Sequence, residues 1–159
     1  MQTEHSNGDV ANLGMVRPPL VFLASIVLGI GLQAAWPLRI TRTTLGTPVG
    51  AALLLLAVML FVSAVRTFRR AGTPVPGNEP TTTIVRDGPY RFTRNPIYLA
   101  FSLFLLGLAF LVNSVWLLLT MAIFVAVISL IVIPREERYL ERRFPEEYGS
   151  YTRSVRRWL

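Results

Sequence analysis

Two groups of polar residues adjoin long apolar runs in the C-terminal half of the sequence. The segment from Asp87 to Tyr98 carries arginine, asparagine and tyrosine side chains directly before one apolar run, and Pro134-Arg135-Glu136-Glu137 follows the next. Adjacent carboxylates at the end of a membrane span, under a negatively charged leaflet, gain nothing from the membrane potential. Pairing with surface arginines would contribute only about 0–1 kcal/mol, so a cationic ligand group would use these carboxylates better. The pattern predicts a chemical site at a membrane surface.

A simpler interpretation of the segment from Arg94 to Tyr98 stays open from the residues alone. Pro96 could begin a helix that Asn95 caps, while Arg94 contacts lipid phosphate and Tyr98 joins the interfacial aromatic belt. That interpretation needs no ligand.

Composition excludes several kinds of chemistry. The chain has 159 residues, of which 52% are hydrophobic, with no cysteine and no lysine, so 16 arginines carry all its positive charge. These values describe one small membrane domain without disulfides or thiolate chemistry. Because the single histidine, His5, lies in a polar leader, histidine triads and most transition-metal sites are excluded. We expect neither a metal nor a nucleic-acid partner.

The hydropathy pattern predicts an all-α integral membrane protein with about four transmembrane helices and an amphipathic helical tail. Each apolar run approaches the roughly 20 residues that cross a hydrocarbon core, and none contains an acid or a base. The four predicted spans are Pro18 to Leu38, Pro48 to Val65, Pro96 to Val112, and Val115 to Ile133. Only Asn113-Ser114 separates the last two, which favours a tight helical hairpin over one long helix.

The distribution of arginines predicts the topology. With both termini in the cytoplasm, 14 arginines lie on the cytoplasmic side and two on the other, as the positive-inside rule requires. The loop before Pro96 and the C-terminal tail, and hence the active site, then share the cytoplasmic face. We expect residues 1–16 to be a flexible leader, residues 17–70 to hold the first two spans, and residues 71–159 to hold the last two spans and the cytoplasmic tail.

Turn residues and β-branched residues organise the polar segments. The β-branched run from Thr81 to Val85 suits an extended strap, and Asp87-Gly88-Pro89 predicts a turn after it. The tail reads as two amphipathic helices broken at Pro145. We expect the second of these helices to hold Arg153, Arg156 and Arg157 in its last turn.

Two runs of the sequence match a known family. The stretch from Thr82 to Tyr98 and the stretch from Glu136 to Tyr151 resemble the C-terminal core of isoprenylcysteine carboxyl methyltransferases and the related membrane phospholipid methyltransferases. The resemblance extends from about Thr81 to Leu159, and it implies that residues 71–159 form a cofactor-binding methyltransferase core. The family hallmark is Arg-His-Pro-x-Tyr, then a hairpin of two spans, then Glu-Glu. Here Asn95 replaces the histidine and Ala100 stands where glycine is usual, so position 95 can form hydrogen bonds but cannot titrate.

The resemblance implies that S-adenosylmethionine binds in a pocket made by the strap, the turn and the last two spans. The positions that would contact the cofactor are Thr82, Thr83, Ile84, Val85, Tyr90, Asn95, Pro96, Ile97, Tyr98 and Glu136. The chemistry of these residue types agrees, because the cofactor needs an anion for its ammonium, donors for its carboxylate and aromatic faces. Glu136 would supply the anion, the strap amides with Asn95 or Arg94 the donors, and the two tyrosines the faces.

Methyl transfer from a sulfonium requires alignment more than acid–base catalysis, and well-oriented placement can account for about 7–11 kcal/mol of barrier. A carboxylate acceptor needs no base, whereas an amine acceptor would lose its proton to a group such as Glu137 or Tyr98. We therefore assign catalytic roles to Tyr98, Glu137 and Arg94, and binding of an anionic acceptor or headgroup to Arg135. The lipid-soluble acceptor would enter sideways from the membrane. A prenylated cysteine carboxylate, a phospholipid amine and another hydrophobic metabolite all remain open.

Two alternatives belong to other functional classes. A nicotinamide-dependent membrane reductase of sterol-like lipids can have a similar tail, although a dinucleotide needs more phosphate-binding groups than one turn offers. A non-catalytic lipid-binding membrane subunit would need no cofactor at all.

Overall fold

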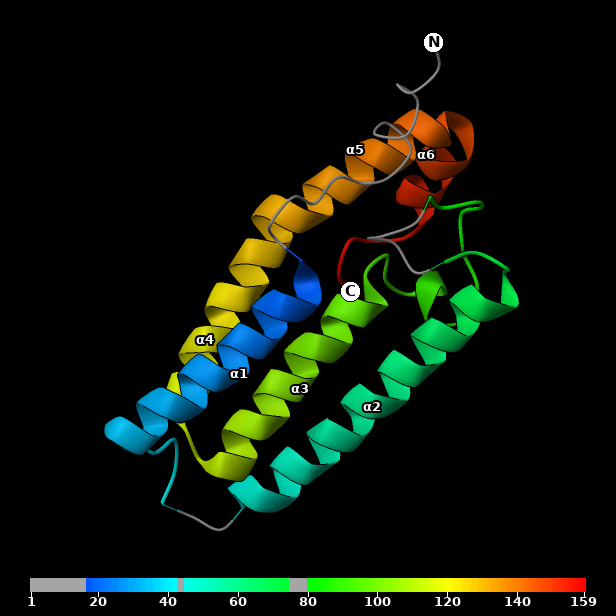
Figure 1. The fold of residues 1–159 in the computed structure, drawn as a ribbon. Helices are drawn as coiled ribbons and strands as arrows, with labels where there is room; N and C mark the ends of the chain where they lie inside the picture. The colour runs from blue at the N-terminus through cyan, green and yellow to red at the C-terminus, as the bar shows by residue number, and fades with distance from the viewer. Residues whose placement is uncertain (1–16, 43–44, 75–79) are drawn as a thin grey trace.

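The computed structural model describes residues 17–42, 45–74 and 80–159, and these form helices joined by short connections with no strand among them (Figure 1). The elements in chain order are α1 (Pro18–Ala35), α2 (Gly46–Arg70), the 3-10 helix η1 (Gly88–Arg91), α3 (Pro96–Val112), α4 (Val115–Val127), the π-helix η2 (Ile128–Val132), α5 (Ile133–Arg143) and α6 (Pro145–Ser154). The predicted leader lies outside the described residues.

The helices confirm the predicted all-α, multi-pass membrane architecture. Among the described residues, α1, α2 and the continuous helix Val115–Arg143 are long and apolar enough to cross a membrane, and α3 is a shorter apolar helix of 17 residues. Successive helices run in opposite directions. The start of α1, the end of α2, the start of α3 and the α5–α6 tail therefore meet at one end of the bundle (Figure 1). Which side of the membrane this end faces remains a prediction.

Small residues determine how closely α2 and α3 pack. An added Cβ on Gly50 would lie 2.6 Å from the backbone nitrogen of Leu111 and 2.7 Å from the carbonyl oxygen of Gly107. On Gly107, it would lie 2.9 Å from the carbonyl oxygen of Gly50 and from the backbone nitrogen of Leu54. These contacts involve backbone atoms, which cannot rotate away. The two glycines thus let the helix backbones touch, as small residues do in membrane helix pairs.

The far end of the bundle is closed by the predicted hairpin. Asn113 adopts the left-handed conformation with φ of 56°, and the Ser114 hydroxyl accepts a hydrogen bond from the backbone of Leu117. The Asn113 side chain also bonds three backbone groups of Ile40 and Thr41. One residue therefore ends α3 and holds the α1–α2 connection.

The fourth span does not stop where hydropathy predicts. It continues as one helix from α4 through η2 into α5, which ends at Arg143 rather than near Ile133. Pro134 lacks an N–H group for the normal helical bond, and the π-helix directly precedes it. The helix therefore carries Glu136 and Glu137 on its own extension.

The predicted break at Pro145 is confirmed, but the predicted end of the last helix is wrong. Helix α6 ends at Ser154, and Val155 has an extended backbone with φ of −128° and ψ of 132°. Arg156 and Arg157 thus follow the helix instead of occupying its last turn. The physical reason is that their carbonyl groups bond the segment before α3.

Replacing Gly107 by alanine is expected to lower the thermal unfolding temperature of the purified protein, because the new methyl group meets α2 backbone. Overpacking of this kind costs about 1–3 kcal/mol. Gly31 on α1 is the matched control, since an added Cβ there has no atom within 4 Å. Gly31→Ala should leave the unfolding temperature unchanged or raise it slightly. Equal effects of the two substitutions would contradict this account of α2–α3 packing.

Candidate functional site

A cavity of about 500 Å³ lies at the end of the bundle where the strap and the tail meet. Among the described residues, every α-helix except α4 contributes lining residues, including α1 and α2. The lining residues are Arg17, Pro18, Pro19, Leu20, Phe61, Val65, Phe68, Thr81, Thr83, Ile84, Val85, Tyr90, Arg94, Asn95, Pro96, Ile97, Tyr98, Phe101, Ile133, Glu136, Glu137, Tyr139, Leu140, Tyr148 and Tyr151. The cavity thus extends beyond the predicted core of residues 71–159.

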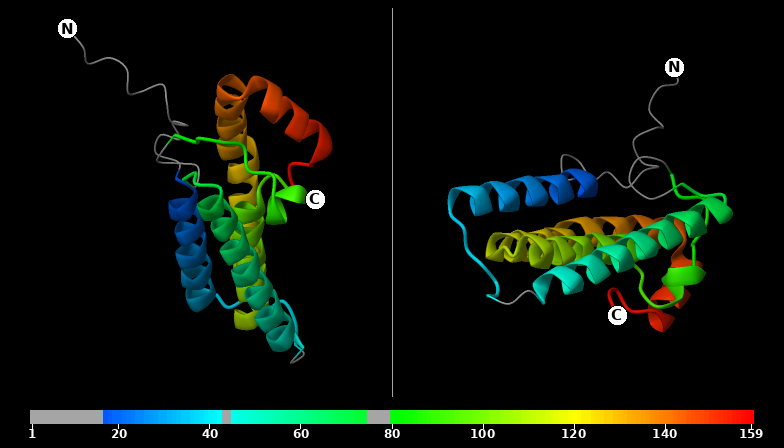
Figure 2. Two further views of the ribbon diagram at one scale, coloured as in Figure 1. Left: turned by 90° about the vertical axis from the view of Figure 1, so that its right-hand side faces the viewer. Right: turned by 90° about the horizontal axis from the view of Figure 1, so that it is seen from below.

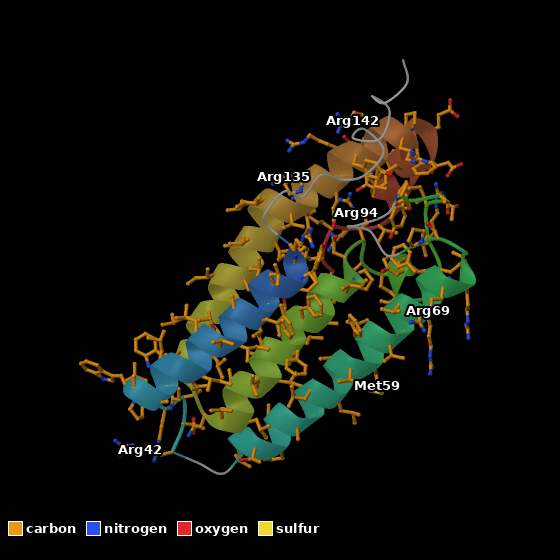
Figure 3. The ribbon with its side chains drawn as sticks, viewed as in Figure 1. Arg42, Met59, Arg69, Arg94, Arg135 and Arg142 are labelled. Carbon is orange, nitrogen blue, oxygen red and sulfur yellow. The ribbon has the colours of Figure 1, made fainter. Side chains whose placement is uncertain are left out.

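Most of the residues predicted from the sequence line this one cavity. They are Thr83, Ile84, Val85, Tyr90, Arg94, Asn95, Pro96, Ile97, Tyr98, Glu136 and Glu137. Thr82 and Arg135 do not line it. The side chain of Thr82 is exposed, and its backbone nitrogen donates to Thr73 Oγ1 at 3.0 Å. Arg135 is half-buried on α5, at the same end of the bundle as Arg94 and Arg142 and opposite Arg42 (Figure 3).

A short hydrogen bond connects the two halves of the predicted site. The Tyr98 hydroxyl donates to Glu136 Oε1 at 2.6 Å, and only 8% of each residue is exposed. Pro96 begins α3, so Tyr98 lies in its first turn, while Glu136 lies in the first turn of α5. Burial of a carboxylate is costly unless it is hydrogen-bonded, and Tyr98 supplies such a bond. Glu136 is therefore held in the cavity wall with one oxygen bonded to a neutral group.

Glu137 has a different environment from its neighbour. Arg157 binds it with two bonds, from Nε to Oε1 at 3.1 Å and from Nη2 to Oε2 at 2.5 Å, and Arg94 Nη1 lies 3.0 Å from Oε1. The hydrogen bond to Glu137 raises the pKa of Arg157. Two guanidinium groups thus neutralise Glu137, whereas Glu136 has no arginine partner among the described residues.

The last residues of the chain hold Arg94 in place. The backbone nitrogen of Arg94 donates to the carbonyl of Arg156 at 3.0 Å, and Asn95 Nδ2 donates to the carbonyl of Arg157 at 2.9 Å. Trp158 then packs against the buried core cluster that contains Tyr98. This return of residues 155–158, which we name the C-terminal return, fastens the loop before α3 to α5. Asn95 consequently bonds backbone rather than capping α3 with its side chain.

The strap has neither helix nor strand structure, bends at Thr83, and contacts α5 at its start. Thr81 makes two hydrogen bonds with α5. Its backbone nitrogen donates to the Tyr139 hydroxyl at 3.2 Å, and its carbonyl accepts from Arg143 Nε at 2.9 Å. Val85 and Tyr90 are buried against Phe68 and Ala64 of α2. The turn at Gly88 has a φ of 57°, which suits glycine. The strap is thus anchored at both ends while its middle residues face the cavity.

Tyrosines from the last helix complete the wall. The Tyr151 hydroxyl donates to the carbonyl of Tyr90 at 2.8 Å, and the Tyr148 hydroxyl accepts from Arg94 Nη1 at 3.3 Å. Burial, with the nearby charge of Glu137, raises the pKa of Tyr148 to about 12. Tyr148 therefore stays neutral at physiological pH and serves as a hydrogen-bonding and aromatic surface.

Sequence reasoning missed the contributions of the other helices. Arg17 and Leu20 of α1, Phe61 and Phe68 of α2, and Tyr139 of α5 line the cavity without having been predicted. Tyr148 and Tyr151 line it as well, and they belong to the amphipathic helix predicted after Pro145. Apolar residues inside a span look alike in sequence whether they face lipid or a cavity.

Comparison with known proteins identifies the family. Residues 45–147 match the family model described as phospholipid methyltransferase, which covers well over half of the chain. The chain belongs to the phospholipid methyltransferase family. This family consists of S-adenosylmethionine-dependent membrane methyltransferases and groups with the isoprenylcysteine carboxyl methyltransferase-like enzymes. Membership confirms the resemblance drawn from the two sequence runs.

A bacterial relative adds no functional information. The chain is 41% identical over 63 residues to an uncharacterized protein of Haemophilus influenzae, a match that covers 40% of this chain and all of that protein. No solved structure matches the chain.

Arg157→Ala is expected to destabilise the protein, because it removes the bidentate partner of Glu137. Since the Arg157 side chain is 41% exposed, the loss should be only about 1 kcal/mol. Thermal unfolding in detergent measures this. Arg156→Ala is the matched control, since its side chain is exposed and its backbone bond to Arg94 remains. Equal unfolding temperatures for the two variants would contradict the assigned role of Arg157.

Proposed function

We propose that this chain binds S-adenosylmethionine in the cavity and transfers its methyl group to a lipid-soluble acceptor that enters from the membrane. The observation that carries the proposal is the Tyr98–Glu136 hydrogen bond of 2.6 Å inside the cavity wall. It joins the two sequence runs that mark this methyltransferase family.

The residues of the cavity fit the cofactor in charge and in hydrogen bonding. Glu136 offers a carboxylate for an ammonium or sulfonium group, and Tyr90, Tyr148 and Tyr151 offer aromatic surface. Two polar atoms of lining residues, Arg94 Nε and Thr81 Oγ1, are buried without a hydrogen-bond partner among the described residues. Buried polar groups are normally satisfied, so unpaired atoms in a cavity wall support a polar ligand that bonds them.

S-adenosylmethionine, when bound, supplies a methyl group on a sulfonium that is already an activated leaving group. The tasks left to the protein are binding, orientation and exclusion of water. Glu136, oriented by Tyr98, would hold positive charge on the cofactor, and Arg94 would donate to a carboxylate. Thr83, Ile84 and Val85 would line the cofactor from the strap, and Pro96 and Ile97 from the start of α3.

The proposed roles of the remaining residues follow from their contacts. Glu137 orients Arg94 and Arg157, so we propose that it acts by holding Arg94 at the cavity. Tyr98 is the group that would take part in proton removal from an amine acceptor, whereas a carboxylate acceptor needs no base. Arg135 lies outside the lining, where it would bind an anionic headgroup at the membrane surface. Thr82 would contribute through the strap backbone.

Glu136→Gln is expected to weaken S-adenosylmethionine binding at least tenfold, because it removes the lining carboxylate that has no arginine partner among the described residues. Isothermal titration of the cofactor into detergent-purified protein measures this. Glu146→Gln is the matched control, since Glu146 is exposed on α6 and does not line the cavity. It should bind as the wild type does.

Three outcomes would overturn the proposal. Equal affinities of the Glu136→Gln and wild-type proteins would exclude Glu136 as the cofactor ligand. Tight binding of a nicotinamide dinucleotide with no binding of S-adenosylmethionine would favour the reductase, and binding of neither would favour a lipid-binding subunit. Transfer of radiolabelled methyl groups into a total lipid extract would then test the reaction itself.

A further inference from the structure

Three phenylalanine rings from three helices form a continuous row beneath the cavity. The rings of Phe22 on α1 and Phe101 on α3 are stacked with centroids 4.5 Å apart, and those of Phe101 and Phe61 on α2 with centroids 5.7 Å apart. The interplanar angles of 16° and 23° show that the rings are nearly parallel. We name these three residues the aromatic row.

A fourth ring fixes the row against the bundle core. Phe124 of α4 has no exposed surface and makes edge contacts with Phe22 at 6.1 Å and with Phe101 at 6.3 Å. Aromatic contacts of this kind stabilise a fixed arrangement of rings. The row is therefore a rigid part of the fold.

The aromatic row marks the inner end of the cavity. On α3 the lining extends from Pro96 no further than Phe101, and on α2 it extends from Phe68 no further than Phe61. On α1 it ends at Leu20, in the turn that also holds Phe22. Pro96 and Phe101 are five residues apart, which corresponds to a depth of about 7.5 Å along α3. A straight apolar chain would meet the rings at that depth.

The same region of the cavity opens sideways. Helix α1 packs against α4 and α2 packs against α3, so the two helices do not run side by side (Figures 1 and 2). Leu20 and Phe61 line the cavity from these two helices, yet they are 57% and 37% exposed. Exposed surface on two lining residues places them at the mouth of the cavity. Both residues belong to helices that are long and apolar enough to cross a membrane, so this mouth can admit a molecule from the bilayer.

We propose that the aromatic row is the floor of the acceptor site and limits the length of the apolar chain that the site accepts. The chain enters between Leu20 and Phe61 and ends against the rings. This inference rests on the proposed function, because the occupant is the methyl acceptor.

Binding of unbranched alkanoic acids with four to twelve carbons tests the floor without methyl transfer. Equilibrium dialysis against protein in nanodiscs, with empty nanodiscs subtracted, gives affinity as a function of chain length. For the wild type, each added carbon should tighten binding roughly fourfold until the chain reaches the rings, and additional carbons should then add little. We call the chain length at which the affinity stops rising the break. Phe101→Ala should move the break to longer chains, and Phe101→Leu, which keeps the position apolar, should move it less.

Phe110→Ala is the matched control, because Phe110 lies on α3 but does not line the cavity. Its break should coincide with that of the wild type. The inference would be overturned if binding were not saturable or if the wild-type series showed no break. It would also be overturned if Phe101→Ala had the same break as the wild type. These outcomes are separate from failure of the proposed function, which would appear as loss of cofactor binding in the wild-type titration while the chain-length series stays intact.

Discussion

The hydrogen bond between Tyr98 and Glu136 is the constraint on which the architecture of the site depends. The two residues are 38 positions apart in sequence, and their meeting requires the hairpin to return to the level at which it started. Helix α3 has 17 residues, and the returning run has 13 in α4 and five in η2. At 1.5 Å per residue both arms are about 25–27 Å long, so the return brings α5 back beside the start of α3. Asn113 makes the tight reversal that this geometry needs.

The protein gives two adjacent carboxylates opposite environments. Glu137 is enclosed by Arg94 and Arg157, while Glu136 contacts the neutral hydroxyl of Tyr98. The C-terminal return makes this difference, because it brings Arg157 to one face of α5 and bonds the residues before α3. A cationic group next to Glu136 would favour the ionised form of this carboxylate, and no described arginine competes for it there. The tail is thus as much a part of the site as the hairpin.

The features that depend on local chemistry could be predicted from the sequence. Pro96, Asn113-Ser114 and Pro145 mark helix boundaries, and the structure begins or ends helices at each of them. The stretches from Thr82 to Tyr98 and from Glu136 to Tyr151 also identified the family and many of the residues that line the cavity. What could not be predicted depends on long-range contacts.

The early end of α6 is one such case, since backbone carbonyls of residues 156 and 157 bond a segment some 60 residues away. The extension of the fourth span to Arg143 is another, because hydropathy falls at Pro134 while helical hydrogen bonding resumes after the π-helix. The contribution of Arg17, Leu20 and Phe61 to the cavity arises from helix packing alone. Lipid-facing and cavity-facing residues have the same composition.

The central claim is that Tyr98 and Glu136 act as one unit in cofactor recognition. A double-mutant cycle on S-adenosylmethionine affinity, with Tyr98→Phe, Glu136→Gln and the double variant, tests it most directly. The account predicts a coupling energy of about 0.5–3 kcal/mol, since a contacting pair is not additive. Effects of the two substitutions that add within about 0.3–0.5 kcal/mol would contradict the claim, because the hydrogen bond would then have no part in holding the cofactor.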